Sequence, residues 1–284
     1  MSRPLIVCDC DEVLLHMVAP FRDWLGDSQG VTFAMKSNNF SDAMRWTESG
    51  EAVEPAEIWR LLRAFFESEM HRQMPIDGAV EAMGELAERA DIVILTNLID
   101  AHRDLRQAQL GAHGIAARVF TNQGPKGPAL QAIIAEYEPS HTIFIHALPQ
   151  HHQSARETIG EITTLHLCGE PLLAPHIDCA HAAGHADARI DSWAEALPWL
   201  HAQLDRLTPS HRRQAGDRQA GQRPRHRARR PGGARLRADD PCPAGGRRPA
   251  RPRRTGGEAG RLRRLHPRFL RPAQGGERRL GADG

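Results

Sequence analysis

Short apolar runs alternate with longer amphipathic stretches along the first two hundred residues of this chain. Continuous apolar runs predict buried strands, and these lie at residues 4–8, 91–95, 117–120, 142–145 and 162–167. Helix-like stretches lie between and after them, around residues 78–90, 101–110, from 128 onward, 149–159 and 192–204. Strands that alternate with helices in this way predict a parallel sheet covered on both faces. We therefore expect an α/β fold of the doubly wound type.

The segment between His16 and Pro75 has a different pattern, which we interpret as helices rather than strands. Apolar residues at helical spacing predict a helix of about twenty residues that starts near Pro55. These residues are Ile58, Leu61, Leu62, Phe65, Phe66 and Met70. Asp77 is expected to cap the helix that follows, over residues 78–90.

Two acids, Asp9 and Asp11, stand directly after the first predicted strand. A spacing of two places both side chains on the same side of a pleated strand. In a catalytic interpretation one carboxylate attacks a substrate, while the other gives a proton to the leaving group and takes one from water. In the alternative interpretation the pair only caps a turn or a helix, because Asp accepts hydrogen bonds from free backbone N–H groups.

Further polar groups follow other predicted strands. Thr96 and Asn97 come after the strand at 91–95, and Lys126 lies in the loop 122–128. Only two of the 37 basic Lys and Arg residues are lysines, Lys36 and Lys126, so a compact ammonium at this loop is notable. Ligands of parallel sheets bind outside the carboxyl ends of the strands. We expect Asp9, Asp11, Thr96 and Lys126 to converge on one small pocket there.

This order of motifs resembles that of the haloacid dehalogenase-like (HAD) superfamily of hydrolases. The resemblance covers about residues 1–205 and rests on Asp9-Cys10-Asp11-Glu12-Val13, Ile94-Leu95-Thr96-Asn97 and Gly124-Pro125-Lys126-Gly127. It implies a Rossmann-like core domain from residues 1–16 and 76–207. It also implies a small helical cap of the C1-like type, inserted over residues 17–75.

The resemblance further implies phosphate monoester hydrolysis. Asp9 would form an aspartyl-phosphate, and Asp11 would act as general acid and base. Thr96, Asn97 and Lys126 would bind the phosphoryl group of a small phosphorylated metabolite. Asp9 and the backbone carbonyl of Asp11 would hold Mg²⁺ together with a third acid. Because a phosphate ester needs a proton for its leaving oxygen, the presence of Asp11 favours a phosphatase over a dehalogenase.

The third acid is missing from this sequence. The family pattern places it after the strand 142–145, where His146 and Ala147 stand, and no carboxylate occurs between Glu138 and Glu157. Three interpretations follow. The magnesium site is weakened and activity is low; His146 binds a softer divalent metal; or the chain is a catalytically inactive binding protein that has kept the pocket.

The net charge of +2 sums two unlike segments. Residues 211–284 contain 22 Arg, no Lys and 6 acids, which gives +16; the rest of the chain, with 15 basic and 29 acidic residues, carries −14. The Arg-, Pro- and Gly-rich tail from about residue 208 to 284 has too few apolar residues for a core, so we expect disorder. It would bind nucleic acid non-specifically if it is genuine. The alternative is a shifted reading frame in GC-rich DNA.

The remaining features of the sequence indicate an ordinary cytoplasmic protein. It has neither an 18-residue apolar run nor the apolar core of a signal peptide, so we expect no membrane partner. Its five cysteines lack zinc-site spacing and are expected to be reduced; they are Cys8, Cys10, Cys168, Cys179 and Cys242. His176, His181 and His185 are expected to be loop histidines at the surface rather than a metal cluster.

Overall fold

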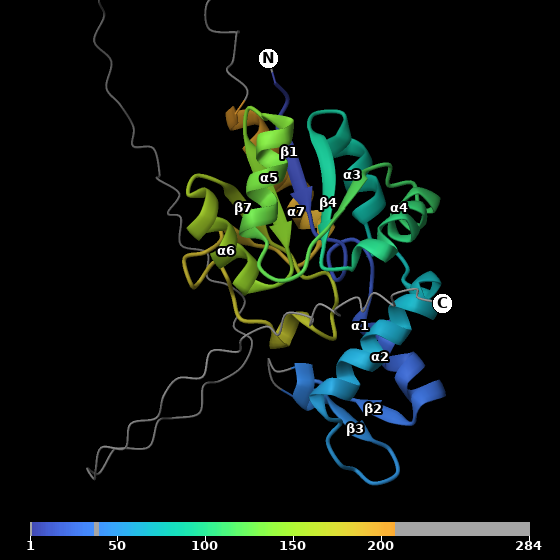
Figure 1. Ribbon diagram of the computed structural model, residues 1–284. Coiled ribbons are helices and arrows are strands. Elements are labelled where there is room, and N and C mark those ends of the chain that lie inside the picture. Colours follow the sequence, from blue (N-terminus) through green and yellow to red (C-terminus); the bar gives the residue numbers. More distant parts are fainter. Residues whose placement is uncertain (1, 37–39, 208–284) are drawn as a thin grey trace, which may run out of the picture. The chain divides into compact units, whose positions relative to one another are not determined.

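A six-stranded parallel sheet forms the centre of the computed structural model, which describes residues 2–36 and 40–207 (Figure 1). Its strands are β1 (Leu5–Cys8), β4 (Asp91–Thr96), β5 (Arg118–Thr121), β6 (Thr142–His146), β7 (Thr163–His166) and β8 (Ala188–Arg189). They lie in the order β5-β4-β1-β6-β7-β8. The five predicted strands are confirmed. Strand β8 was not predicted, because two half-buried residues give no apolar run.

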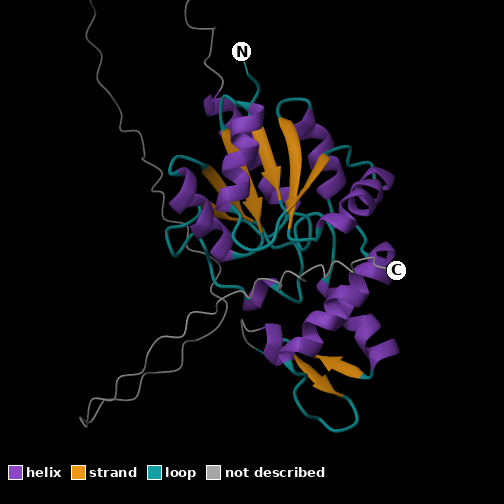
Figure 2. Cartoon of the chain, viewed as in Figure 1, coloured by secondary structure: helices purple, strands orange, loops and turns teal. Residues whose placement is uncertain are grey.

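Helices cover both faces of this sheet (Figure 2). Ile6 and Cys8 of β1 face a core shared with α3 (Ala79–Ala87), α4 (Arg103–Ala112) and α7 (Trp193–Leu207). Leu5 and Val7 face the opposite core, shared with α5 (Gly127–Tyr137) and α6 (Pro149–Ile159). Successive residues of a strand point to opposite faces, so a strand buried on both sides must be apolar throughout. The doubly wound α/β fold is confirmed.

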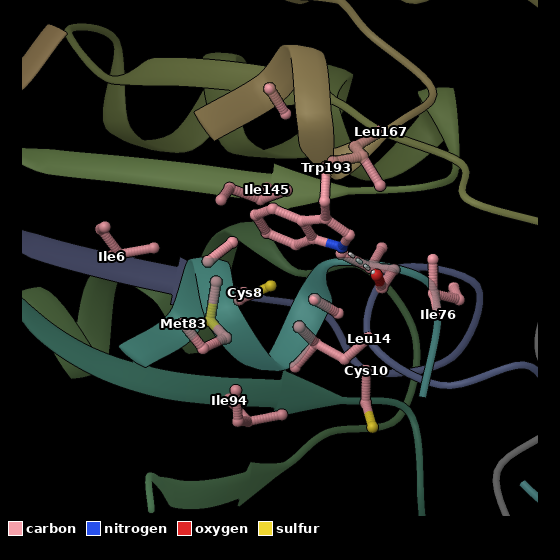
Figure 3. Close-up of a cluster of buried hydrophobic side chains, with 14 of the residues drawn as sticks. Ile6, Cys8, Cys10, Leu14, Ile76, Met83, Ile94, Ile145, Leu167 and Trp193 are labelled. Atoms are coloured by element: carbon pink, nitrogen blue, oxygen red, sulfur yellow. Dashed lines mark hydrogen bonds between the residues drawn. The ribbon is translucent and has the colours of Figure 1, made fainter. Parts of the chain in front are cut away.

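The last helix closes the larger of these cores through Trp193. Its indole packs against strand residues such as Ile145 and against the loop that follows β1 (Figure 3). The indole nitrogen donates a hydrogen bond of 2.7 Å to the backbone oxygen of Val13. A buried tryptophan needs a partner for its N–H group, and here that partner lies in the loop that follows Asp9 and Asp11. Trp193 therefore helps to fix that loop.

The segment between β1 and α3 contains both helices and a hairpin. It comprises α1 (Val18–Trp24), a π-helical turn (Leu25–Gln29), β2 (Val31–Phe33), a 3₁₀ turn (Phe40–Ala43), β3 (Met44–Trp46), α2 (Pro55–Ser68) and a 3₁₀ turn (Met70–Arg72). The prediction of helices without strands was wrong here, since β2 and β3 pair antiparallel. Three-residue strands are too short to show a period of two.

This segment has an apolar cluster of its own. The cluster contains Phe21, Trp24, Leu25, Val31, Met44, Val53, Ile58, Leu61 and Phe65. Helix α2 starts at Pro55 as predicted but has 14 residues, because the chain turns at Glu69. The division into a cap at 17–75 and a core at 1–16 and 76–207 stays a prediction.

Several smaller predictions can also be compared with the structure. Gly78, at φ 78°, is the N-cap of α3 and no side chain caps this helix, so the prediction for Asp77 was wrong. Cys8, Cys10 and Cys168 are buried free thiols and Cys179 is half-buried. Within the described ranges, no helix is long and apolar enough to cross a membrane. Cys242 and the basic tail at 208–284 lie outside the described residues.

Candidate functional site

Asp9 follows β1 at the point where the strand order of the sheet reverses. From β1 the chain proceeds to β4 and β5 on one side, and later to β6, β7 and β8 on the other. Such a reversal leaves a crevice at the carboxyl ends of the central strands. Thr96 ends β4, His146 ends β6, and Lys126 directly precedes α5. Three of the four predicted residues, Asp9, Thr96 and Lys126, are thus buried at this edge.

Lys126 and Thr96 are buried hydrogen-bond donors at this edge of the sheet. The ammonium of Lys126 lies 3.8 Å from Oδ1 of Asp9 and donates a 2.8 Å hydrogen bond to the backbone oxygen of Leu95. The hydroxyl oxygen of Thr96 is buried and has no hydrogen-bond partner in the described structure. A buried hydroxyl without a partner costs free energy unless a ligand satisfies it. The Thr96 hydroxyl is therefore a free donor at the same edge of the sheet as the Lys126 ammonium, a combination that suits an anionic oxygen.

The carboxyl group of Asp9 is largely desolvated, with 6% of the residue exposed. Burial, opposed by the charge of Lys126 and assisted by the charge of Asp11, raises the pKa of Asp9 from 3.8 to about 7. Burial disfavours the charged form of an acid, and a neighbouring acid does the same. Near pH 7, Asp9 is therefore divided between a neutral carboxyl and an ionised carboxylate.

Asp11 is held by two residues that the sequence analysis missed, Arg106 of α4 and Gln73. Its Oδ1 accepts hydrogen bonds from Nη2 of Arg106 at 2.9 Å and from Nε2 of Gln73 at 2.8 Å. Arg106 and Gln73 are both fully buried. The guanidinium also donates to the sulfur of Cys10 at 3.1 Å and to Oε1 of Gln73 at 3.1 Å. Arg106 lies one helical turn before Leu110, on the buried side of α4, and this spacing marks the residue as buried without indicating its partner.

Asn97 was predicted to contact substrate, but its side chain supports the neighbouring loop. Its Nδ2 donates to the backbone oxygen of Gly124 at 3.3 Å, and its Oδ1 accepts from Nδ2 of Asn122 at 3.2 Å. The loop 122–125 leads directly to Lys126. The contacts of Asn97 therefore support a positioning role, and a contact with substrate stays a prediction.

His146 stands beside Asp9 in the place of the missing acid. Its Nδ1 lies 3.3 Å from Oδ2 of Asp9 and accepts a 3.1 Å hydrogen bond from the backbone N–H of Leu148. That bond assigns the ring proton to Nε2, which is buried without a partner. Burial, together with the ring of His151 and the ammonium of Lys126, lowers the pKa of His146 well below its usual value. His146 is thus neutral.

Three more buried histidines surround His146. The ring of His151 stacks on that of His146 with centroids 4.4 Å apart, and His152 contacts His166 with centroids 5.3 Å apart. Burial lowers the pKa of His151 and of His152 to about 3, and that of His166 to about 4. These four imidazoles bring no positive charge to the pocket at neutral pH.

The residues around Asp9 do not fit magnesium well. Mg²⁺ prefers an octahedral set of oxygen ligands. Asp9 offers one carboxylate and Asp11 its predicted backbone carbonyl, whereas Oδ1 of the Asp11 side chain already accepts hydrogen bonds from Arg106 and Gln73. Ala147 has no donor, and Nδ1 of His146 already accepts the hydrogen bond from Leu148. A softer divalent ion at His146 would have to displace that hydrogen bond.

A parallel sheet with this strand order, covered by helices on both faces, belongs to the Rossmann-like class of folds. Here an acid, Asp9, follows the central strand β1, and Lys126 directly precedes α5. No family model and no curated protein matches the sequence significantly. Solved structures do match. A haloacid dehalogenase-like family hydrolase from Streptococcus pneumoniae is 12% identical, with a TM-score of 0.51 over 70% of this chain and 98% of that chain.

Two further structures are similar in fold. A HAD family hydrolase from Deinococcus radiodurans, with bound phosphate and sodium, is 19% identical, with a TM-score of 0.51 over 72% of this chain and 98% of that chain. A haloacid dehalogenase-like hydrolase from Burkholderia xenovorans is 17% identical, with a TM-score of 0.50 over 72% and 99% of the two chains. The chain therefore has the fold of the haloacid dehalogenase-like hydrolases, and the predicted resemblance is confirmed for the fold.

Proposed function

We propose that this chain is a weak phosphomonoesterase that binds the phosphoryl group of a small metabolite beside Asp9. The observation that carries the proposal is the buried Lys126 ammonium 3.8 Å from Asp9, at the sheet edge where the buried hydroxyl of Thr96 has no hydrogen-bond partner. A hydroxyl donor, an ammonium and a carboxylate nucleophile are the groups that transfer of a phosphoryl group to an acid requires.

In the proposed reaction a carboxylate oxygen of Asp9 attacks phosphorus, and the bond to the ester oxygen breaks. Asp11 gives its proton to that leaving oxygen. Water then attacks the phosphorus of the aspartyl-phosphate, Asp11 takes a proton from it, and inorganic phosphate leaves with Asp9 restored. Asp11 would act through Oδ2, because Oδ1 accepts hydrogen bonds from Arg106 and Gln73.

Two features support low activity. Burial raises the pKa of Asp9 to about 7, so only part of the population has the ionised nucleophile at neutral pH. His146 and Ala147 provide no carboxylate to help hold a magnesium ion, so we propose a weakened magnesium site. The same features favour a second candidate function, a binding protein that recognises phosphate esters without turnover.

The test compares wild-type protein with Asp9→Asn on aryl, sugar and nucleotide phosphates, with and without magnesium. Asp205→Asn, an exposed aspartate paired with Arg89, is the matched control. We expect slow turnover by the wild type and the control, and a loss of about 100-fold or more in Asp9→Asn. Turnover that survives Asp9→Asn would contradict the proposal. Tight binding of inorganic phosphate with no turnover by the wild type would favour the second candidate.

A further inference from the structure

A second cluster of ligand-type side chains lies outside the Asp9 pocket. It consists of Glu12 in the loop after β1, His16 just before α1, and Glu170 in the loop after β7. One ligand atom from each of the three lies within 4.8 Å of the others. Across residues 2–36 and 40–207 this is the one group of three such residues with that geometry. The cluster therefore joins the segment 12–16 after β1 to Glu170, which lies 154 residues after His16 in the sequence.

Glu12 has one satisfied and one unsatisfied carboxylate oxygen. The residue is 3% exposed, and its Oε1 accepts hydrogen bonds from the backbone N–H groups of Met17 and Val18 at 3.0 and 2.6 Å. Its Oε2 is buried without a hydrogen-bond partner. A desolvated carboxylate oxygen without a partner is costly. This atom therefore indicates a missing cationic or proton-donating group.

Glu170 brings a second buried carboxylate to the same place. It is 2% exposed; its Oε1 accepts from the backbone N–H of Leu172 at 2.9 Å, and its Oε2 lies 2.8 Å from Nδ1 of His16. Burial and the charge of Glu170 raise the pKa of Glu12 well above its usual value. His16 is the only member of the cluster that can be positive, so two buried acids share at most one charge partner.

The backbone holds Glu12 in place for this arrangement. Its N–H donates to Leu15 at 2.8 Å and its carbonyl accepts from Gly169 at 2.7 Å. Glu12 has a φ of 65°, a left-handed conformation that is unfavourable for a residue with a Cβ atom. Gly169 has no space for a side chain, because a Cβ there would lie 2.7 Å from Ile76. The loop after β1 and the loop after β7 are therefore held together at Glu12 and Gly169, and Glu170 is the next residue after Gly169.

We propose that Glu12, His16 and Glu170 bind one divalent transition-metal ion, zinc being the best match. Two carboxylate oxygens and one imidazole nitrogen are zinc-type ligands, whereas magnesium and calcium prefer oxygen alone. The side chain of His16 is 28% exposed, which leaves access for the ion and for water as a further ligand. A bound ion links the start of α1 to the loop after β7 and satisfies Oε2 of Glu12.

The experiment is calorimetric titration of the full chain with zinc after treatment with a chelator. Glu170→Gln keeps the size of the side chain and removes its charge. The matched control is Glu85→Gln, because Glu85 also pairs with a histidine, His201 at 3.5 Å, but is 60% exposed. We expect one equivalent of zinc to bind to wild type and control, and affinity to fall about 100-fold or more in Glu170→Gln.

Asp9→Asn should keep this equivalent, which separates the cluster from the Asp9 pocket. Zinc should raise the midpoint temperature of thermal unfolding of wild type but not that of Glu170→Gln, since an ion that binds only the folded state stabilises it. If Glu170→Gln does not fold, Glu12→Gln replaces it, because its amide oxygen can still accept from Met17 and Val18. Unchanged zinc affinity in the folded cluster variant, or no binding to folded wild type at about 1 mM zinc, would overturn the proposal.

Discussion

The imidazole Nδ1 of His146 lies 3.3 Å from Oδ2 of Asp9, where the resemblance to the HAD superfamily leads us to expect a carboxylate. Because Nδ1 accepts a hydrogen bond from Leu148, it cannot donate a proton to Asp9. The contact therefore joins two acceptors unless Asp9 itself carries the proton. His146 thus favours the neutral form of Asp9. A carboxylate at position 146 could instead bind a cation together with the carboxylate of Asp9.

The raised pKa of Asp9 predicts a specific dependence of stability on pH. The pKa is about 7 in the folded state and 3.8 in its ordinary state, so the folded state binds more protons between these values. Its contribution to stability is present at low pH and is lost as pH rises through 7. Between pH 5 and 8 the unfolding free energy of wild type should fall by about 2–3 kcal/mol more than that of Asp9→Asn. Urea unfolding at each pH measures this, and parallel curves for the two proteins would contradict it.

The buried histidines predict the opposite trend at acidic pH. Burial lowers the pKa of His151 to about 3, so the unfolded state binds a proton near pH 6.5 that the folded state does not. This contribution is present above pH 6.5 and is lost as pH falls. The free energy of unfolding should fall by about 2 kcal/mol less between pH 7.5 and 5 in His151→Phe, which keeps a ring to stack on His146, than in wild type. His181→Phe, in a loop, should show the same decrease in the free energy of unfolding as wild type, which urea unfolding at each pH measures.

Arg106 should be the most sensitive position of α4. Arg106→Met leaves Asp11, Gln73 and Cys10 without their shared donor. Breaking one partner of a buried ion pair costs about 3–5 kcal/mol, and we expect about 2–4 kcal/mol because the side chain of Asp11 is 19% exposed. Arg103→Met, at an exposed pair with Asp104, should change the unfolding free energy by less than about 0.5 kcal/mol. Denaturant unfolding compares the two, and equal small changes would show that Arg106 is dispensable.

The chain contains its own control for Lys126. Lys126 and Lys36 are its only lysines; Lys126 is fully buried beside Asp9, and Lys36 is exposed. Lys126→Met should weaken binding of inorganic phosphate by about 10–100-fold, since a hydrogen bond to a charged group contributes about 1.5–3 kcal/mol. Lys36→Met should leave phosphate affinity unchanged. Calorimetric titration of both variants with inorganic phosphate tests this prediction. Equal affinities would show that Lys126 does not bind phosphate.

Five of the six strands of the sheet could be predicted from the sequence, but the details of the site could not. Asp9, Thr96 and Lys126 could be placed because each follows or neighbours a strong apolar run, and parallel strands end at a common edge. Arg106 and Gln73 could not, because their partner Asp11 is about 95 and 62 residues away and no local pattern encodes such a contact.

The hairpin, the start of α3 and the environment of His146 also depend on contacts or conformations that no local pattern shows. The β2–β3 hairpin was missed because its strands have three residues each and its pairing depends on contacts across a long loop. The N-cap was misplaced by one residue, since Gly78 can adopt the positive φ that the start of α3 requires. From the sequence, His146 was interpreted as the replacement of a missing acid and, in one alternative, as the ligand of a softer divalent metal. Its neutral ring and its contact with Asp9 depend on the pairing of β6 with β1.

Magnesium-dependent phosphatase activity of His146→Asp, alone and with Ala147→Asp, tests the role of this position most directly. An acid beside Asp9 provides the oxygen ligand that Mg²⁺ prefers, so kcat/KM on an aryl phosphate should rise about 10-fold or more. The rise should depend on magnesium and disappear when Asp9→Asn is added, and His181→Asp should show no gain. If neither His146 variant gains turnover or magnesium affinity over wild type, the proposal that His146 limits a phosphatase is wrong.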